Sequence, residues 1–584
     1  WSGQILAYNL TTEQGKGGVK AVVWDSNRTV RAGSRSLYTY NPTAESVRGS
    51  QLDWDSLNDQ QKSWFARNDG ALMGQARVNW LQGVPDTTAP GNSLRARSVL
   101  MGDIINSSLT LRDPITNYGY KLLPGVEGTS YASFLADKIK SSASLLFGTN
   151  DGMFHALDPK TGEELFAYVP NEVIKRLPDI SSPLYGCDEA DCLKHEYMVD
   201  GVSTLGDAYL SGGWRTVLLG TLGLGGQGLF ALDVSEPENF SETDILWEIS
   251  SSQAPDNAAT FSQHLGYTQP SASIVRIKNG KWVAVVANGY DSKSKQAVLF
   301  VIDMETGALI KSFNTLSGSE ASPNGLSTPT VVDMDGDFVA DRVYAGDMLG
   351  NLWSIDISSE DTAEWKFSYG NNAAPEPFFR TCSDNSCTDP QAITAAPQVG
   401  KNQVSGLMVY IGTGRYFDIA DGSLEFPGFD SFYGVQDNGV TVKRSELVKQ
   451  EILADVAVTS DLKSRITSDN SVDYTNDRGW YLDLLTPPAA RANGERVISK
   501  AILRGGRIIF TTLTPTVGRC DLGGTSWIME IDAQDGSRLS VVTFDVNDDM
   551  AFTEADNSTY QDDPTVVSGL QQVSLGLVRS APVI

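Results

Sequence analysis

Histidine and positive charge are both scarce in this chain of 584 residues. The three histidines, His155, His195 and His264, are scattered, which disfavours a histidine-based hydrolase. Lys and Arg total 45 against 72 Asp and Glu, so the formal net charge is −27. Because so acidic a surface repels phosphate backbones, we expect no nucleic-acid partner.

Long apolar runs are missing as well. No uninterrupted apolar stretch approaches the roughly 18 residues of a transmembrane helix, so we expect no transmembrane segment in this chain. The hydrophobic fraction of 41% is nevertheless enough for a large core. Strand-like sequence begins at once, in 4-QILAYNL, so we expect a mature portion or a fragment of a longer protein.

Cysteine is rare, but four of the five cysteines form two local pairs. Cys187 and Cys192 flank one polar loop, and Cys382 and Cys387 flank another. This C-x4-C spacing favours small disulfide-closed loops over zinc, because only one histidine lies near a pair. We therefore expect the periplasm or the cell exterior. Cys520 is left over, either free or paired outside this chain.

A two-strand unit recurs along the chain. Each copy has a short β-branched strand, a turn or excursion, a second strand with alternating apolar residues, and a polar turn of the D-x-x-T-G kind. Equivalent turn positions are held by Asp158, Asp233, Asp303, Asp356 and Asp532. A small residue or Thr followed by Pro and an apolar run marks the first strand of several copies, as in 268-TQPSASIV, 328-TPTVV, 395-AAPQV and 580-SAPVI.

The repeats predict an all-β fold, a seven-bladed β-propeller formed as one domain over residues 1–584. Six units are internal, and a seventh blade is shared between residues 1–25 and about 575–584. Two β-sandwiches are the alternative, but they do not require a recurring signature. The units are long for propeller repeats, so the loops carry insertions, the largest over about residues 41–144.

Short helices are expected inside these insertions. The stretch 55-DSLNDQQKSWFAR has a capping box in Ser56 and Asp59, and 131-YASFLADKIK predicts a second helix. The stretch 443-KRSELVKQEILADV is predicted to be helical in part. His155 lies inside a strand and is expected to be a packed core residue, and Asp151 to be a hairpin-turn residue.

The most informative stretch is 331-VVDMDGDFVAD-341. Asp333, Asp335 and Asp337 take positions 1, 3 and 5 of a calcium loop, Val339 offers its carbonyl at position 7, and Asp341 takes position 9. Clustered carboxylates repel one another, and a hard cation such as Ca²⁺ offsets that repulsion with this oxygen spacing. Gly lies at position 4 and Phe338 at position 6, and the flanks are strands. We therefore predict a calcium loop in a β-turn, not an EF-hand; a solvated Asp-rich turn is the alternative.

A second acidic stretch, 545-DVNDDMAFTEAD-556, is a weaker candidate. It offers Asp545, Asn547, Asp549 and Asp556, but Met550 stands where Gly is usual, and Thr553 is a poor ligand for position 9. An ordinary acidic loop explains it equally well.

Five motifs together resemble the C-terminal propeller of the type IV pilus tip adhesin and biogenesis factor family, the PilC/PilY type. They are 148-GTNDGMFHALDPKTGEELFAYVP, 199-VDGVSTLGDAYLSGGWRTVLLGTLGLGGQGLFALDV, 333-DMDGDFVADRVYAGDMLGNLWSID, 411-IGTGRYF and 525-TSWIMEIDAQDG. They spread over nearly the whole chain.

This resemblance implies a quinoprotein-dehydrogenase-like propeller without enzymatic activity, with a calcium loop at Asp333–Asp341. It implies a place at the pilus tip or outer membrane surface, reached through the periplasm. It also implies work with minor pilins in pilus assembly, in extension and retraction, in twitching motility and in attachment to host or abiotic surfaces. The variable N-terminal region that family members usually carry is not in this chain, and Phe338 stands where Gly is commoner.

Two other readings stay open on the sequence. A quinone-dependent dehydrogenase shares the turn motif, but this chain has neither the adjacent cysteines of many such enzymes nor a C-x-x-C-H haem site. A generic extracellular binding propeller with no pilus connection is compatible with the fold, because fold alone does not fix function.

Overall fold

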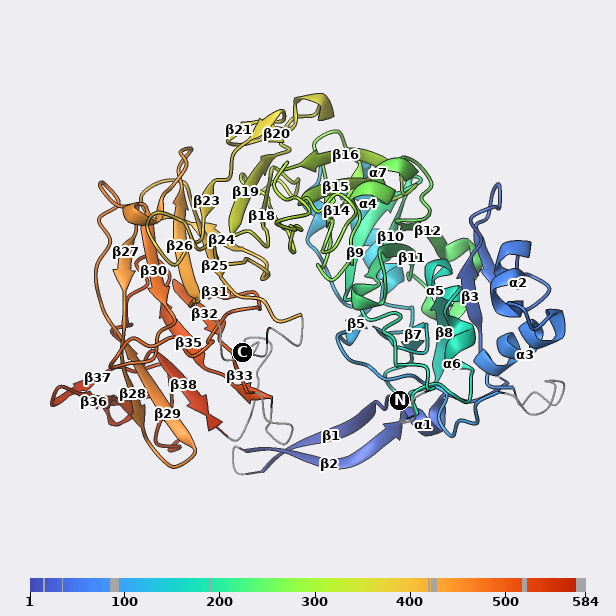
Figure 1. Ribbon diagram of the computed structural model, residues 1–584, viewed down its shortest axis with the longest axis horizontal. Coiled ribbons are helices and arrows are strands. Elements are labelled where there is room, and N and C mark those ends of the chain that lie inside the picture. Colours follow the sequence, from blue (N-terminus) through green and yellow to red (C-terminus); the bar gives the residue numbers. More distant parts are fainter. Residues whose placement is uncertain are drawn as a thin grey trace. The chain divides into compact units, whose positions relative to one another are not determined.

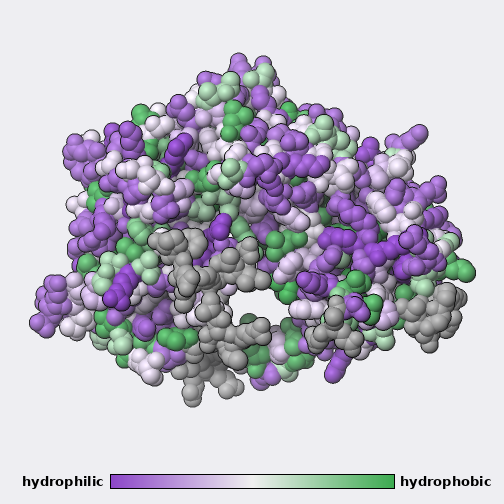
Figure 2. All heavy atoms as spheres, viewed as in Figure 1, coloured by the Kyte–Doolittle hydropathy of each residue, from purple (hydrophilic) through white to green (hydrophobic). Residues whose placement is uncertain are grey.

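The computed structural model describes residues 1–13, 16–33, 35–84, 94–187, 191–417, 421, 428–516 and 523–573. The chain divides into two compact units, Trp1–Ser312 with Asp335–Ala340, and Phe313–Met334 with Asp341–Ile584. Both are built mainly from antiparallel sheets (Figure 1). None of the helices in the described residues is long and apolar enough to cross a membrane. Hydrophilic side chains cover most of the face shown in Figure 2, with small hydrophobic groups scattered among them.

The first unit holds three sheets of four or six strands and one two-stranded sheet. The sheet orders are β4-β3-β8-β7-β6-β5, β12-β11-β10-β9, β13-β14-β15-β16 and β1-β2. The strands are β1 (Leu6–Glu13), β2 (Lys16–Asp25), β3 (Leu37–Tyr40), β4 (Gly49–Gln51), β5 (Thr110–Arg112), β6 (Ser144–Gly148), β7 (Phe154–Leu157), β8 (Glu164–Val169), β9 (Ser203–Leu210), β10 (Gly213–Thr221), β11 (Gly228–Asp233), β12 (Ile245–Ser250), β13 (Ser273–Arg276), β14 (Trp282–Ala287), β15 (Val298–Asp303) and β16 (Leu309–Asn314).

The second unit holds three sheets of five or six strands. Their orders are β17-β18-β19-β20 with β23 paired to β19, β24-β25-β26-β30-β27, and β28-β29-β38-β35-β32-β31. The strands are β17 (Thr330–Val332), β18 (Arg342–Gly346), β19 (Asn351–Asp356), β20 (Lys366–Phe367), β23 (Phe379–Arg380), β24 (Gln398–Lys401), β25 (Leu407–Gly412), β26 (Ser431–Asp437), β27 (Val448–Gln450), β28 (Ile452–Ala457), β29 (Leu462–Thr467), β30 (Gly479–Asp483), β31 (Ile502–Arg504), β32 (Arg507–Thr511), β35 (Ile528–Asp532) and β38 (Gly569–Gln572).

Each of these six larger sheets contains one of the six internal repeat units, so the all-β reading of the sequence is confirmed. The Pro-marked first strands correspond to β13, β17 and β24. The seventh, shared blade stays a prediction. In the described residues β1 and β2 pair only with each other, and residues 575–584 lie outside the described part of the chain.

The D-x-x-T-G turns have the geometry that their residues predict. Asp303 is an example: its carboxylate accepts the N–H groups of Glu305 and Thr306 at 3.0 and 3.1 Å, and Gly307 N–H donates to its carbonyl at 2.9 Å. Gly307 has φ of +72°, a conformation that glycine adopts at little cost.

Three of these turns also receive a tryptophan from another sheet of the same unit. The Trp247 indole on β12 lies against Gly307, where an added Cβ would come within 2.8 Å of the ring, and its Nε1 donates to Met304 O at 2.9 Å. Trp24 on β2 meets Gly162 in the same way, and Trp480 on β30 meets Gly536. Each of these turns therefore follows a strand of its own sheet and also packs against another sheet of the same unit.

Short helices fill the insertions, as expected, but with different boundaries. They are α1 (Ser26–Thr29), α2 (Asp59–Ala66), α3 (Ala71–Leu81), α4 (Gly125–Lys138), α5 (Asn171–Ile174), α6 (Leu177–Ile180) and α7 (Ala258–His264). The capping box of α2 is formed by Asn58 and Gln61, so the predicted cap at Ser56 and Asp59 is wrong. The stretch 443–456, predicted to be helical in part, has only a single 3₁₀ turn at Arg444–Glu446, and the rest forms β27 and most of β28.

Candidate metal centre

The acidic stretch 333–341 connects β17 to β18 as a hairpin loop. The two strands pair antiparallel, with Val332 opposite Arg342. Asp341 N–H donates to Val332 O at 3.0 Å, which closes the base of the loop. The strand pairing thus fixes the two ends of the loop and brings its side chains close together.

Three of the predicted ligands converge. One carboxylate oxygen from each of Asp333, Asp335 and Asp341 lies within 4.8 Å of the others, and the first two residues are exposed. Met334 N–H donates to Asp341 Oδ2 at 2.7 Å, so the loop backbone orients one of these carboxylates. In the described part of the chain, these three aspartates form the one cluster of potential metal-ligating side chains whose ligand atoms lie this close together. Carboxylate oxygens at this density suit a hard cation.

Asp337 is not part of that group. Its Oδ2 forms an ion pair with Lys278 Nζ at 3.0 Å, and its Oδ1 accepts the N–H of Val339 at 2.9 Å. Burial tends to raise the pKa of Asp337, but Lys278 and the Val339 N–H outweigh it and lower the pKa. The lysine ammonium therefore neutralises the fourth carboxylate. Val339 itself is buried.

Phe338 shapes the loop in a way that the sequence did not reveal. Its φ is +65°, in the left-handed region that costs a side-chain-bearing residue about 1 kcal/mol or more. Its ring lies edge-on to Tyr120, with centroids 6.0 Å apart. The next residue but one, Ala340, donates its N–H to Arg276 O at 2.8 Å. Packing on Tyr120 offsets the backbone strain, which explains how Phe is accommodated where Gly is the easier choice.

The second acidic stretch uses its carboxylates on its own backbone. Asp545 accepts the N–H of Met550 at 2.8 Å, and Asp556 accepts those of Val546 and Thr553 at 2.8 and 2.9 Å. Burial tends to raise the pKa of Asp556, but these backbone donors lower it. These bonds are those of an Asp-stabilised loop, and a calcium site here has no further support.

Both cysteine pairs are disulfide-bonded. Cys187 and Cys192 have Cα atoms 5.4 Å apart, and Cys382 and Cys387 have Cα atoms 5.1 Å apart. Cys520 lies outside the described residues.

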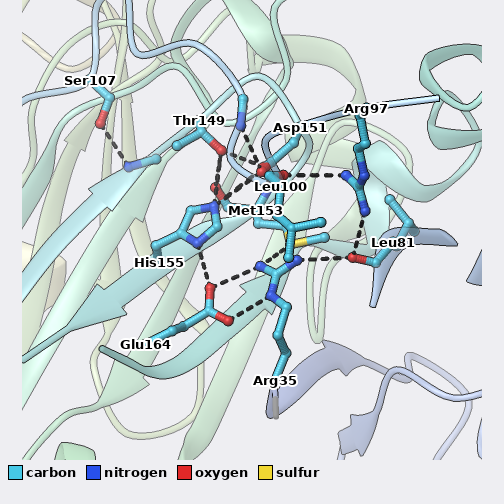
Figure 3. A network of polar contacts seen from close by, with 12 residues as sticks. Arg35, Leu81, Arg97, Leu100, Ser107, Thr149, Asp151, Met153, His155 and Glu164 are labelled. Atoms are coloured by element: carbon cyan, nitrogen blue, oxygen red, sulfur yellow. Dashed lines mark hydrogen bonds and ion pairs between the residues drawn. The ribbon is translucent and has the colours of Figure 1, made fainter. Parts of the chain in front are cut away.

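His155 lies in a buried network of charges, shown in Figure 3. Its Nδ1 meets Glu164 Oε1 at 2.8 Å, and its Nε2 lies 3.3 Å from Asp151 Oδ2. Glu164 in turn pairs with Arg35 through two contacts of 2.6 and 2.8 Å. Burial alone would lower the pKa of His155, but the two carboxylates raise it to about 9. The prediction of a packed core histidine is confirmed; its charged partners, including Asp151, were not foreseen.

Comparison with known proteins identifies the class and then the family. A family model described as the PilY1 beta-propeller domain matches residues 101–458, more than half of the chain. The fold is therefore a β-propeller. The chain belongs to the PilY1 family.

Individual relatives agree. A type IV pilus biogenesis factor PilY1 homologue of Xylella fastidiosa is 37% identical over 80% of this chain and 31% of its own length. The type IV pilus biogenesis factor PilY1 of Pseudomonas aeruginosa strain PAK is 32% identical over 99% of this chain and 51% of its own. This chain therefore spans about half of the Pseudomonas aeruginosa protein and about a third of the Xylella fastidiosa protein.

A solved structure is similar too. The crystal structure of the Pseudomonas aeruginosa PilY1 C-terminal domain superposes with a TM-score of 0.62 at 31% identity, covering 76% of this chain and 89% of that one.

Proposed function

We propose that this chain is the non-enzymatic, calcium-binding propeller of a type IV pilus-associated protein. In this proposal the whole protein acts at the pilus tip or outer membrane surface. It supports pilus biogenesis, the control of extension and retraction, twitching motility and surface attachment. Family membership supports the pilus connection, and the PilY1 relatives are type IV pilus biogenesis factors.

The convergence of Asp333, Asp335 and Asp341 is the observation that carries the calcium part. Three carboxylates supply up to six oxygens, and Ca²⁺ takes six to eight from carboxylates, carbonyls and water. A bound ion would cancel the mutual repulsion of these side chains. The residues fit such an ion because their oxygens already lie together and belong to one short loop closed by strand pairing.

One feature of the loop limits how tightly it binds calcium. Lys278 competes for Asp337, and the resident ammonium must move before that carboxylate can join the site. Magnesium is a poor fit, because it holds its water firmly and prefers strict octahedral geometry. We therefore expect calcium selectivity with modest affinity.

Calorimetric titration of Ca²⁺ into the metal-stripped chain tests this directly. Asp335→Asn removes one converging carboxylate and is expected to abolish measurable binding. Asp337→Asn is expected to weaken it far less. Asp256→Asn, at an exposed aspartate elsewhere in the chain, is the matched control and should bind like the unaltered protein. Equal binding by the Asp335 variant and the control would place the ion elsewhere.

The partner proposed for the pilus role is the minor-pilin complex of the pilus tip. A pull-down of purified minor pilins by the tagged full-length protein, with and without Ca²⁺, tests it. Retention of the pilins by the full-length protein is expected. A generic binding propeller would retain none, and that result would remove the pilus-tip assignment.

The enzymatic alternative has its own test. A dye-linked oxidation assay with added pyrroloquinoline quinone and Ca²⁺ over a panel of alcohols and aldose sugars should give no turnover above the protein-free rate. Reproducible turnover would revive a quinone-dependent dehydrogenase.

A further inference from the structure

A small polar cavity lies in the first unit, away from the acidic loop. Its volume is about 210 Å³, the space of roughly seven water molecules, so it can hold a small ligand or one substituent of a larger ligand. Its wall includes Trp80, Arg95, Arg97, Asp103, Asn150 and Tyr185.

Arg95 is held rigidly at this cavity. Its backbone N–H donates to Ser181 O at 2.8 Å, and its Nε donates to Ile180 O at 3.0 Å. The guanidinium carbon lies 5.5 Å from the ring centroid of Trp80 and 5.4 Å from that of Tyr185. Trp80 Nε1 donates to Arg95 O at 2.7 Å. The side chain is thus preorganised between two aromatic rings, as recognition arginines are.

Among the residues that the structure describes, the Arg95 guanidinium has no carboxylate partner. Over the described residues no acidic oxygen lies within 4.0 Å of it, and its two terminal nitrogens donate no hydrogen bond. Burial lowers its pKa, while Tyr185 acts weakly in the opposite sense. A partly buried cation without a counter-ion is costly, and an anion in the cavity would offset that cost.

Arg97 adds a second positive charge to the same wall. Its guanidinium stacks 3.8 Å from the Trp80 ring centroid and donates to carbonyl oxygens, including those of Leu100 and Leu81. Burial lowers the pKa of Arg97 to about 9, and the charges of Arg35 and Arg95 contribute. It remains cationic at neutral pH, so Arg95 and Arg97 repel one another across the site.

The charged side chains in the wall of this cavity are two arginines, Arg95 and Arg97, and two aspartates, Asp103 and Asp151. Asp103 is already engaged by His195 Nε2, at 3.0 Å from its Oδ2. Asp151 is engaged by His155 Nε2, at 3.3 Å from its Oδ2, so both aspartates already have partners, and an anionic ligand would compensate Arg95.

Another part of the cavity wall offers hydrogen-bonding groups fixed by their neighbours. Asn150 Nδ2 donates to Asp103 Oδ2 at 2.9 Å, and Asn150 N–H donates to Asp103 O at 3.0 Å. Gly102 N–H donates to Asp151 Oδ2 at 2.9 Å. Asp103, Asn150 and Asp151 are all buried, so this wall is a built polar surface. Carboxylate and amide groups in such a setting suit the hydroxyls of a sugar.

We propose that this cavity binds a small sugar acid, with Arg95 recognising its carboxylate and the Asp103–Asn150 wall receiving its hydroxyls. Arg97 contributes charge without direct contact. Size, local charge and polarity favour this class over a neutral sugar, which leaves the guanidinium uncompensated. They also favour it over a peptide acid, which lacks hydroxyl groups to hydrogen-bond with the Asp103–Asn150 wall.

Titration of the 584-residue chain with D-glucuronate at low ionic strength, followed by calorimetry, tests the proposal. D-Glucuronamide removes only the ligand's charge, D-glucose removes the carboxyl group, and N-acetyl-L-glutamate amide presents a carboxylate without the sugar. Glucuronate is expected to bind at least tenfold more tightly than the other three. Equal affinities for glucuronate and glucuronamide, equal affinity for the glutamate derivative, or no binding at millimolar glucuronate would each overturn it.

Arg95→Met tests the residue while keeping an unbranched stem between the rings. It is expected to abolish the preference for glucuronate over glucuronamide. Arg28→Met, at an exposed arginine of the same unit, should leave the preference unchanged. An unchanged preference in Arg95→Met would overturn the assignment of Arg95. If that variant does not fold, the comparison of the four ligands on the unaltered chain still decides.

Discussion

Lys278 is a resident cation at the acidic loop, and its ion pair with Asp337 is half exposed. Ion pairs of this kind contribute about 0.2–1 kcal/mol. Lys278→Met frees Asp337 and removes a positive charge beside the carboxylates. We expect calcium affinity to rise about 1.4- to fivefold, measured by calorimetry, since that energy corresponds to this range. Lys293→Met, at a lysine that contacts Ser262, is the control. Weaker binding by Lys278→Met would mean that the lysine holds Asp337 in a binding position.

His155 makes a second prediction at the scale of one residue. Its pKa is raised from about 6.5 in the unfolded chain to about 9 in the fold. Because the folded protein holds this proton more tightly, the stabilisation is complete below pH 6.5 and is lost as pH rises through 9. We expect the free energy of unfolding to fall by on the order of 2 kcal/mol over this window.

Urea denaturation at pH 6.5 and pH 9 measures that change. His155→Gln should be less stable at both values, because it leaves two buried carboxylates short of a partner, and it should flatten the pH dependence. His264→Gln should keep the dependence of the unaltered protein, since His264 lies outside the network and burial lowers its pKa. The same pH dependence in His155→Gln would assign the proton to another group.

Single residues show where the sequence sufficed and where it did not. The spacing of Asp333, Asp335 and Asp341 was enough to predict that their carboxylates converge, because a short hairpin loop restricts the positions of its side chains. Lys278 could not be predicted, since it is 59 residues from Asp337 in sequence. The α2 cap was missed because Asn58 and Ser56 are both good caps, and tertiary packing chose Asn58.

At the scale of whole elements, the contact between the Trp247 indole and the Gly307 turn can be tested by substitution. Gly307 and Gly212 both have positive φ, +72° and +80°, but an added Cβ meets the Trp247 ring at Gly307 and nothing within 4 Å at Gly212. Substitution of either glycine by Ala costs about 1–2 kcal/mol of stability, because Ala must then adopt a left-handed backbone conformation. Gly307→Ala should cost a further 1–3 kcal/mol or so because the indole must shift. Chemical denaturation measures both. Equal losses would show that the indole moves aside freely.

At this scale the strands were easier to predict than the helices. Alternating apolar residues followed by a turn of the D-x-x-T-G kind identified the central hairpin of five of the six larger sheets, because the period of two and the turn agree. The stretch 443–456 has a helix-like composition but forms strands. β27 pairs in parallel with β30, and β28 pairs antiparallel with β29. Sheet pairing outweighs a weak helix preference, and a sequence window does not contain the partners.

For the whole molecule, calcium should raise thermal stability by mass action. A ligand at a hundred times its dissociation constant adds about 2.7 kcal/mol to the state that binds it. We expect the melting temperature to rise with Ca²⁺ and to fall on chelation, measured by scanning calorimetry. Asp335→Asn should lose this response.

Ionic strength is the necessary control because the net charge is −27. Salt screens self-repulsion in such a chain and raises the melting temperature without any specific site. Mg²⁺ at equal concentration should give only this smaller effect. Equal shifts with Mg²⁺ and Ca²⁺ would contradict a calcium-selective loop.

The contact of Trp24 with the Gly162 turn has a consequence for the first 25 residues. Trp24 is buried with Ile5, Phe147 and Leu157, and it docks on the first large sheet as Trp247 docks on the sheet that follows its own. β2 therefore gives the first large sheet the same kind of tryptophan contact that β12 gives the sheet of β13–β16. Proteolytic cleavage after Asp25 would therefore remove a buried tryptophan from this core, rather than shorten an unpacked terminus.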